Sequence, residues 1–249
     1  DNKYENEDIV FEEHKYDDYL FQTGLFATQF PIKQAPVKNR QVFYELEDDI
    51  VAVSDNFTGT VWNTGVMRHG KYYSIETAAN FDGNPITLGE ILQDETEVPD
   101  KYFLTDKAKL EKFQYLRGPK KLERTSADGH TYIYSEGGMS PYDDLNLPGR
   151  TMLTSEGTVN RSTHFLFVNN KYRLLTPIEA ERLQDFPDDW TAYKKLEDGT
   201  VVEVSDKMRM FFMGNALVTE IVRKIGDFIK ELGKTLPEDE YEQRAEDVW

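Results

Sequence analysis

The 249-residue chain contains no cysteine. This absence excludes disulfides, thiolate metal sites and a cysteine nucleophile within the chain. The histidines are scattered, with no pair at helical or strand spacing: His14, His69, His130 and His164. We therefore expect no metal site. A chain without cysteine also suits a reducing cytoplasm, which is the compartment that we expect.

Long hydrophobic runs are missing as well. No segment approaches the roughly 18 apolar residues that a membrane span needs, and the chain opens without a signal sequence, so we expect no membrane partner. Hydrophobic residues still make up 39% of the chain and aromatic residues 13%, which is enough for a packed core. The chain begins at Asp1 rather than Met, which indicates either a piece of a longer protein or a trimmed start.

Positive charge is scarce, and the formal net charge is −17. Such a chain repels nucleic acid unless its basic residues gather locally. Much of the acid lies within residues 1–18 and 238–247, whereas Thr105–His130 holds seven basic residues against four acidic ones, a local net charge of +3. The basic residues of this segment are Lys107, Lys109, Lys112, Arg117, Lys120, Lys121 and Arg124. The segment is either a DNA contact or a solvated helix face.

The hydrophobic pattern predicts an α+β fold. Residues 1–84 read as short strands and loops, and residues 117–170 as strands with glycine turns. Helices are expected near Leu88–Gln93 and near Asp106–Leu116. Two further helices are expected towards the end of the chain, and no internal repeat is present.

The first of these late helices lies in "LLTPIEAERLQDFPDDW". Thr176 suits the N-cap, Pro177 the first helical position, and Glu179 completes a capping box. Pro187 ends the helix after two to three turns, which is too short to be stable without tertiary packing. Its apolar side chains must therefore bury against another element.

The last helix is expected over residues 217–232, where apolar residues recur at three- and four-residue spacing. Gly233 and Pro237 are expected to end it. Gly214 and Asn215 would then lie at its N-terminal end, where free N–H groups favour a polar ligand. Asn215 either contacts such a ligand or caps the helix.

Two other stretches resemble a nucleotide-binding motif and a metal site, but their residues do not fit either role. "GVMRHGKY", residues 65–72, imitates the glycine spacing of a phosphate-binding loop, but Tyr72 stands where a magnesium-binding hydroxyl is needed. Asp188 and Asp189 are adjacent acids after a helix, with no metal-ligand partner at suitable spacing. No nucleophile, base and acid combine into a catalytic set.

Together, the segments that hold the two late helices resemble conserved motifs of DNA (cytosine-5)-methyltransferases. "RLLTPIEAERLQDFPDDW", Arg173–Trp190, resembles the family's ninth conserved motif, and "SDKMRMFFMGNALVTEIVRKI", Ser205–Ile225, resembles its tenth. Pro148–Leu166 is similar to the end of the target-recognition domain, and Ile86–Lys107 to the entry into it. The order and spacing of the two motifs match, and the resemblance spans roughly residues 85–232.

The resemblance implies a domain organisation. Residues 1–84 remain an unassigned β and loop region, either an insertion or part of the recognition domain. Residues 85–170 would form the target-recognition domain, and residues 171–232 the helices that complete an S-adenosylmethionine-dependent α/β domain. Residues 233–249 form an acidic tail. The family's F-x-G-x-G, P-C-Q and E-N-V motifs are absent, so the thiolate that adds to C6 of a flipped cytosine is not in this chain.

The resemblance also implies roles for individual residues. The cofactor-facing residues would be Asn215 and Ala216. The residues organising the recognition domain against the catalytic one would be Arg173, Thr176, Pro177, Glu179 and Arg182. The DNA-contacting residues, by position in the loop before the ninth motif, would be Thr151, Thr154, Ser155, Glu156, Gly157 and Arg161. Two positions depart from the family pattern: Ile178 stands where arginine is frequent, and Asp185 where glycine is common.

The resulting expectation is the DNA-recognition and C-terminal part of a methyltransferase that transfers a methyl group from S-adenosylmethionine to C5 of cytosine in duplex DNA. The catalytic half would belong to the same protein or to a separate subunit, and this chain alone would be inactive. Two alternatives stay open: a standalone sequence-specific DNA-binding or regulatory module, and an acidic adaptor that binds a basic partner.

Overall fold

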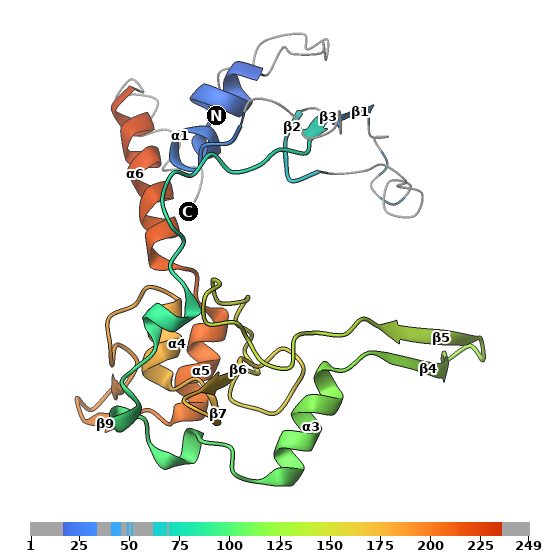
Figure 1. The fold of residues 1–249 in the computed structure, drawn as a ribbon. Coiled ribbons are helices and arrows are strands. Elements are labelled where there is room, and N and C mark those ends of the chain that lie inside the picture. Colours follow the sequence, from blue (N-terminus) through green and yellow to red (C-terminus); the bar gives the residue numbers. More distant parts are fainter. Residues whose placement is uncertain are drawn as a thin grey trace. The chain divides into compact units, whose positions relative to one another are not determined.

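The structure, a computed structural model, describes residues 17–33, 41–45, 49, 51, 62–68 and 70–235. The acidic ends, residues 1–16 and 236–249, lie outside the described residues. The chain divides into two compact units: unit 1 comprises residues 1–83 and 223–249, and unit 2 comprises Asn84–Val222 (Figure 1). Helices and short antiparallel strands alternate along the chain, so the fold is α+β.

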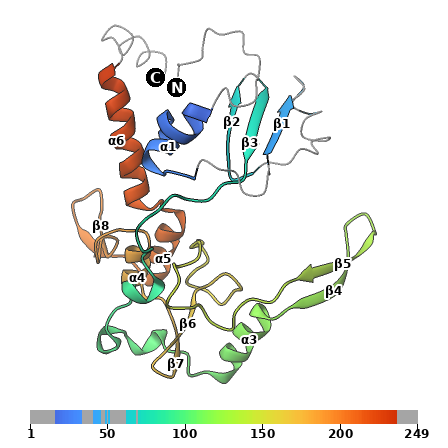
Figure 2. The same ribbon diagram turned by 45° about the horizontal axis from the view of Figure 1, so that its top comes forward.

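Unit 1 contains two helical turns and a small sheet. The turns are η2 (Tyr19–Thr23) and α1 (Leu25–Gln29). The sheet is antiparallel, in the order β1-β3-β2, with β1 Gln41–Glu45, β2 Thr64–Arg68 and β3 Lys71–Ile75 (Figure 2). Leu20, Tyr73 and Ile75 form its buried core. Strands β2 and β3 pair in antiparallel register from Thr64↔Ile75 to Arg68↔Lys71, and Gly70 between them has φ 75°, which is not the strand-to-helix arrangement of a phosphate-binding loop.

Unit 2 contains short helices and three separate hairpins. Its 3₁₀ helices are η4 (Leu88–Ile91), η5 (Glu95–Glu97) and η6 (Asp100–Tyr102). Its α-helices are α3 (Lys107–Arg117), α4 (Pro177–Leu183) and α5 (Asp206–Asn215). Its two-stranded hairpins are β4–β5 (Lys120–Thr125, Thr131–Glu136), β6–β7 (Phe165–Val168, Lys171–Leu174) and β8–β9 (Tyr193–Lys195, Val201–Glu203). The last helix, α6 (Thr219–Thr235), begins in unit 2 and continues in unit 1.

The core of unit 2 brings together segments that are distant in sequence. Its buried apolar side chains are Leu88, Ile91, Met152, Leu166, Leu175, Ala180, Met210 and Met213. Beside them, the ring of Phe165 stacks between Phe113 and Tyr172, with centroid distances of 4.5 and 5.2 Å. Such burial stabilises each large side chain by roughly 1.5–3 kcal/mol. The short helix α4 thus obtains the tertiary packing that its length demands.

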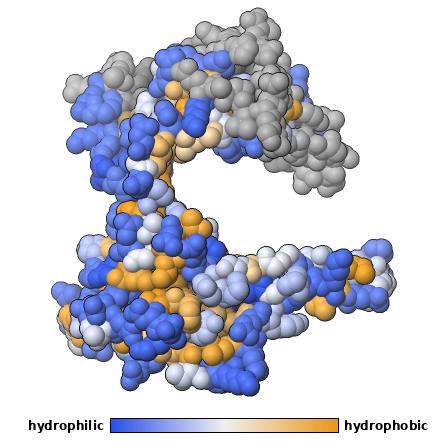
Figure 3. All heavy atoms as spheres, viewed as in Figure 1, coloured by the Kyte–Doolittle hydropathy of each residue, from blue (hydrophilic) through white to orange (hydrophobic). Residues whose placement is uncertain are grey.

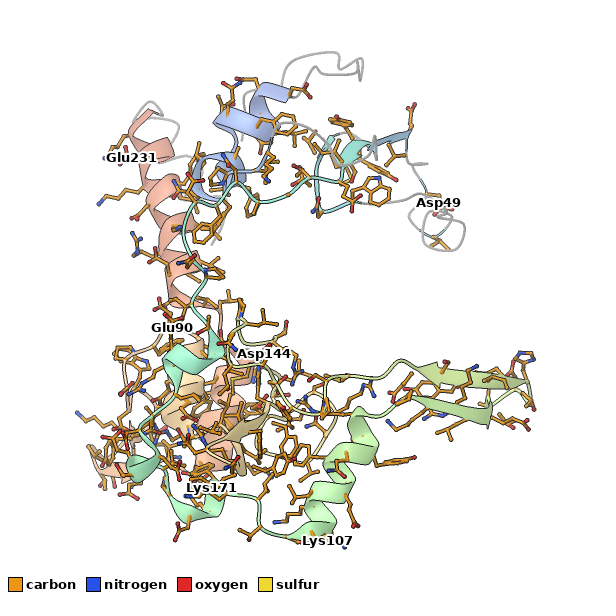
Figure 4. All side chains as sticks on the ribbon, in the orientation of Figure 1. Asp49, Glu90, Lys107, Asp144, Lys171 and Glu231 are labelled. Atoms are coloured by element: carbon orange, nitrogen blue, oxygen red, sulfur yellow. The ribbon has the colours of Figure 1, made fainter. Side chains whose placement is uncertain are left out.

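The predicted helices near Leu88–Gln93 and Asp106–Leu116 are confirmed as η4 and α3. Glu90, labelled in Figure 4, closes the N-terminus of η4 by accepting a hydrogen bond from the Thr87 N–H at 2.6 Å. Within the described residues, no helix has both the length and the apolar character that crossing a membrane requires.

The predicted last helix is confirmed as α6, but its start and the expected stop at Gly233 differ from the prediction, and Pro237 lies outside the described residues. Residues 206–215 form a helix of their own, α5, and the backbone becomes extended at Ala216, with ψ 157°. Gly214 and Asn215 therefore end α5 instead of starting α6. Helix α6 also continues through Gly233 to Thr235, because a glycine within a helix costs only about 1 kcal/mol and does not by itself stop it.

Candidate functional site

The N-terminus of α4 has the capping box that the sequence predicts. The Thr176 hydroxyl accepts a hydrogen bond from the Glu179 N–H at 3.2 Å, and the Glu179 carboxylate accepts one from the Thr176 N–H at 2.9 Å. Pro177 occupies the first helical position. Two N–H groups that a helix start leaves without partners are thereby satisfied.

Arg173 and Glu179 form a buried bidentate ion pair. Both N–O distances are 2.7 Å, and the two side chains are 2% and 0% exposed. Glu179 also accepts the N–H of Gln93 at 2.9 Å, and the Thr176 hydroxyl donates to the Gln93 side-chain oxygen at 2.6 Å. The carboxylate is therefore fully satisfied, and the ninth-motif helix is tied to residues some 80 positions earlier.

Arg182 strengthens the same junction from the other end of α4. Its guanidinium donates to the carbonyl oxygens of Ile91 and Leu92 at 3.2 and 3.3 Å. It also binds Asp188 bidentately at 2.8 and 2.6 Å. The hydrogen bonds from Arg182 hold the pKa of Asp188 below its usual value. Thr176, Glu179 and Arg182 thus attach α4 to the end of η4, and Arg173 holds the Glu179 carboxylate in place.

A second buried cluster joins α4 to α5, and the sequence analysis did not identify it. Arg209 donates to both carboxylate oxygens of Glu181, at 2.9 and 3.0 Å, and to Asp189 at 3.1 Å. Glu181 also accepts the N–H of Thr191 at 2.9 Å. Asp188 and Asp189 therefore serve as arginine partners. Among the described residues, no group of three or more histidine or acidic side chains is placed to hold a metal ion.

The loop before the ninth motif is anchored on Asp143. This carboxylate accepts hydrogen bonds from Arg117 at 2.6 Å, from Arg150 at 2.5 Å and from the Phe165 N–H at 2.8 Å. Both arginines also donate to the carbonyl oxygen of Thr163. Burial opposes ionisation of Asp143, but the hydrogen bonds from Arg150 and Arg117 outweigh it and lower its pKa.

Glu156, which the resemblance places at the DNA, lies inside the loop. It is buried, accepts the His164 N–H at 2.6 Å and lies 3.1 Å from His164 Nδ1. His164 Nε2 accepts the N–H of Arg150 at 3.0 Å, so Nδ1 carries the proton and donates to Glu156. Burial removes Glu156 from surface contact, and we replace its predicted DNA contact with a structural role.

Arg161 is likewise engaged within the protein. Its guanidinium donates to the carbonyl oxygens of Leu116 at 2.8 Å and of Gly137, and lies 3.3 Å from the Glu136 carboxylate. These bonds tie the loop to the base of the β4–β5 hairpin. These internal acceptors hold the Arg161 guanidinium in place, and its contact with DNA stays a prediction.

The remaining predicted DNA contacts lie together on the surface of the loop. Thr151, Thr154 and Gly157 are exposed, and Ser155 is half-buried. The side chain of Asn160, which the sequence analysis did not single out, holds their turns: it donates to the Ser155 carbonyl at 3.0 Å and accepts the N–H groups of residues 162 and 163. These four residues share one ordered loop, and their contact with DNA stays a prediction.

The predicted cofactor residues lie at the C-terminal end of α5. Asn215 is exposed, and its side-chain amide donates to the Phe211 carbonyl at 3.0 Å. Asn215 therefore does not cap the start of α6, as the alternative had it, but bonds a carbonyl group of the last turn of α5. A Cβ at Gly214 would approach the backbone of Leu153 and Thr154 closer than 3.0 Å. The end of α5 therefore packs directly on the loop of predicted DNA contacts.

An exposed apolar stripe runs along α5. Met208, Phe211 and Phe212 are exposed at helical spacing on the face that ends at Asn215, and Leu217, 71% exposed, follows. The opposite face, with Arg209, Met210 and Met213, is buried in unit 2. Figure 3 shows hydrophobic residues collecting on the surface of this unit. Large contiguous apolar patches on protein surfaces are frequent at interaction sites.

The fold and these junctions define a methyltransferase-like α+β chain in which the ninth- and tenth-motif segments support one loop. The chain belongs to the family of C-5 cytosine-specific DNA methylases, which matches it over residues 18–231. It is 46% identical over 234 residues to the type II methyltransferase M.Sau3AI of Staphylococcus aureus, an alignment that covers 94% of this chain and 53% of that relative. The chain thus spans about half the length of M.Sau3AI, and the family match begins within the region that the sequence analysis left unassigned.

Proposed function

We propose that this chain is the DNA-recognition and C-terminal part of a cytosine-5 DNA methyltransferase. It would act with a catalytic half that supplies the thiolate nucleophile, because a family member with no cysteine cannot supply it alone. The methyl group of S-adenosylmethionine would pass to C5 of a cytosine in duplex DNA. The observation that carries the proposal is the exposed apolar stripe of Met208, Phe211 and Phe212, which ends at the predicted cofactor residue Asn215.

The end of α5 fits a shared cofactor site. The side-chain oxygen of Asn215 accepts no hydrogen bond from the residues that the structure describes, so it is free to accept one from a ligand. Asn215 and Ala216 would line one wall, and the catalytic half would supply the rest. S-adenosylmethionine brings the activated methyl group, while these residues orient it and help to exclude water.

Duplex DNA would lie against the loop that Gly214 supports. Thr151, Thr154 and Gly157 offer hydroxyl groups and an unobstructed backbone to phosphates and base edges. The lysines of α3 are exposed and suited to phosphate contacts, among them Lys109 and Lys107, the second of which is labelled in Figure 4. Arg117 is buried against Asp143, so the basic surface is smaller than the sequence suggests.

The test mixes the chain with the half of M.Sau3AI that it does not match and measures methyl transfer to cytosine-containing duplex DNA. We expect transfer by the mixture and none by either part alone. DNA binding by the chain without transfer in the mixture would favour a standalone binding module. Absence of both transfer and DNA binding would favour an adaptor. Affinity for DNA should fall steeply as salt rises, because phosphate contacts release counterions.

A further inference from the structure

The β4–β5 hairpin is a two-stranded ribbon with both faces largely exposed. Its strands pair in antiparallel register from Lys120↔Glu136 to Thr125↔Thr131. Figures 1 and 2 both show it extending from the rest of unit 2. Directly paired residues share a face, so Leu122, Tyr134 and Arg124 lie on one face, whereas Lys121 lies on the other. An uncovered two-stranded ribbon is marginally stable by itself, which suggests that it gains a partner.

A chain of contacts holds Arg124 in place on this ribbon. Its guanidinium carbon lies 3.7 Å from the centroid of the Tyr134 ring, and the Tyr134 hydroxyl donates to Glu136. Glu136 is held by Lys120 at 2.8 Å and by Arg161 at 3.3 Å. The hydrogen bonds from Lys120 and Tyr134 lower the pKa of Glu136 to about 2, so this anchor stays ionised at neutral pH. The side chain of Arg124 is therefore ordered before any ligand binds.

Arg124 also differs from the other arginines of unit 2. Every residue from 84 to 222 is described, and six arginines in that range bond a carboxylate: Arg117, Arg150, Arg161, Arg173, Arg182 and Arg209. For Arg124 the only contact found is the stack on Tyr134, and the residue is exposed. Its N–H donors thus point to no internal acceptor. An ordered guanidinium with free donors is poised for an external, planar pair of acceptors.

We propose that Arg124 is a specificity-determining residue that reads a guanine in the major groove of the substrate duplex. The inference rests on the proposed function and names the element and residue that would read the sequence. A two-stranded ribbon fits the major groove, and guanine presents N7 and O6 there as adjacent acceptors that arginine binds bidentately. Adenine lacks this acceptor pair, since it presents N7 beside an amino donor.

The experiment uses the chain assembled with its catalytic half and a pool of duplexes randomised around one cytosine. Sequencing the methylated duplexes gives the base preference at each position. We expect a guanine preference in the wild type that Arg124→Ala reduces about tenfold or more. Lys121→Ala, on the opposite face, should lower methylation of all sequences similarly and leave the preference intact. Replacing the preferred guanine with 7-deazaguanine removes N7, and should weaken the wild type but not Arg124→Ala.

Arg124→Lys separates charge from geometry. Because lysine keeps the charge and can donate to O6 and N7 but lacks the planar fork, we expect Arg124→Lys to keep only part of the guanine preference that Arg124→Ala loses. An unchanged preference in Arg124→Ala, or full preference in Arg124→Lys, would overturn the inference while leaving the proposed function standing. Absence of methylation by the wild-type assembly would instead overturn the proposed function, and the inference with it. Thermal unfolding of each variant shows whether it is folded.

Discussion

Glu179 illustrates how much one residue of the ninth motif contributes to stability. Its carboxylate accepts bonds from Arg173, Thr176 and Gln93 while fully buried. Glu179→Gln replaces one acceptor oxygen with an amide donor and leaves the Arg173 charge uncompensated. We expect the free energy of unfolding to fall by about 3–5 kcal/mol, measured by urea denaturation.

The matched control is Asp188→Asn, which removes the exposed partner of Arg182. Exposed ion pairs contribute about 0–1 kcal/mol, so this variant should unfold close to the wild-type midpoint. Equal losses in Glu179→Gln and Asp188→Asn would show that the buried position of Glu179 confers no special stability.

At Gly214 the close approach of the neighbouring backbone leaves no room for a larger residue. A Cβ there would meet the backbone of Leu153 and Thr154, which cannot rotate away as a side chain can. We expect Gly214→Ala to lower the free energy of unfolding by about 1–3 kcal/mol and to weaken DNA binding by displacing the loop. Gly226→Ala is the control, since a Cβ at that α6 position meets nothing and a helical alanine should stabilise by up to about 1 kcal/mol. Unfolding of both variants by urea decides the comparison, and a neutral Gly214→Ala would contradict the packing.

The role of a single residue could be predicted from the sequence where its bonding partners lie close to it along the chain. The capping box joins positions three apart, so the spacing of Thr176 and Glu179 was enough to predict it. The bond from Gln93 to Glu179 crosses 86 positions and leaves no trace in local spacing. The wrong prediction for Glu156 has the same cause. Its neighbours along the chain resemble an exposed loop, but its side chain is buried and accepts a hydrogen bond from His164, eight positions later. Asp185 adopts φ 61°, a left-handed conformation that accounts for glycine being common there.

At the scale of elements, the sequence predicts helices that carry their own start signals. Asp106 caps α3 by accepting the Ala108 N–H, and Thr176 caps α4. The break between α5 and α6 has no glycine or proline at residues 216–218, and the apolar pattern runs on across it. Packing of Gly214 against the loop and the bond from Thr219 to the Gln184 carbonyl at 3.1 Å place that break instead. Tertiary contacts therefore determine where α5 ends and α6 begins, which the apolar periodicity of the sequence does not.

The Asp143 cluster links helix α3, strand β6 and the loop, and its stability should depend on pH. The pKa of Asp143 is lowered from its ordinary 3.8, so the folded state binds the proton less tightly than the unfolded one. Its contribution is therefore complete above this ordinary value and is lost as the pH falls through the lower, folded-state pKa. We expect the stability difference between the wild type and Asp143→Asn to be large at about pH 7 and to shrink by about pH 3, in urea unfolding. A difference that stays constant with pH would contradict the cluster's role.

At the scale of the whole molecule, the exposed stripe on α5 needs a partner that would cover Phe211 and Phe212. Their rings lie 6.4 Å apart, and both are exposed beside Met208. The chain spans about half the length of M.Sau3AI, and under the proposed function a catalytic half corresponding to the unmatched part would cover both rings. Exposed aromatic residues at a future interface act as binding anchors.

We expect the double variant Phe211→Ser, Phe212→Ser to bind the catalytic half at least about tenfold more weakly, since anchor residues cost 1–2 kcal/mol or more when truncated. The free energy of unfolding of the isolated chain should fall by about 1–3 kcal/mol, because both rings are partly buried, and the variant should stay folded. Methyl transfer should fall when the catalytic half is limiting and recover when it is in excess, as mass action requires. Val201→Ser, an exposed apolar position on β9, is the control and should leave binding unchanged. Titration of the labelled catalytic half measures the affinities, and equal binding by the Phe211, Phe212 variant and the wild type would exclude the stripe as the docking surface.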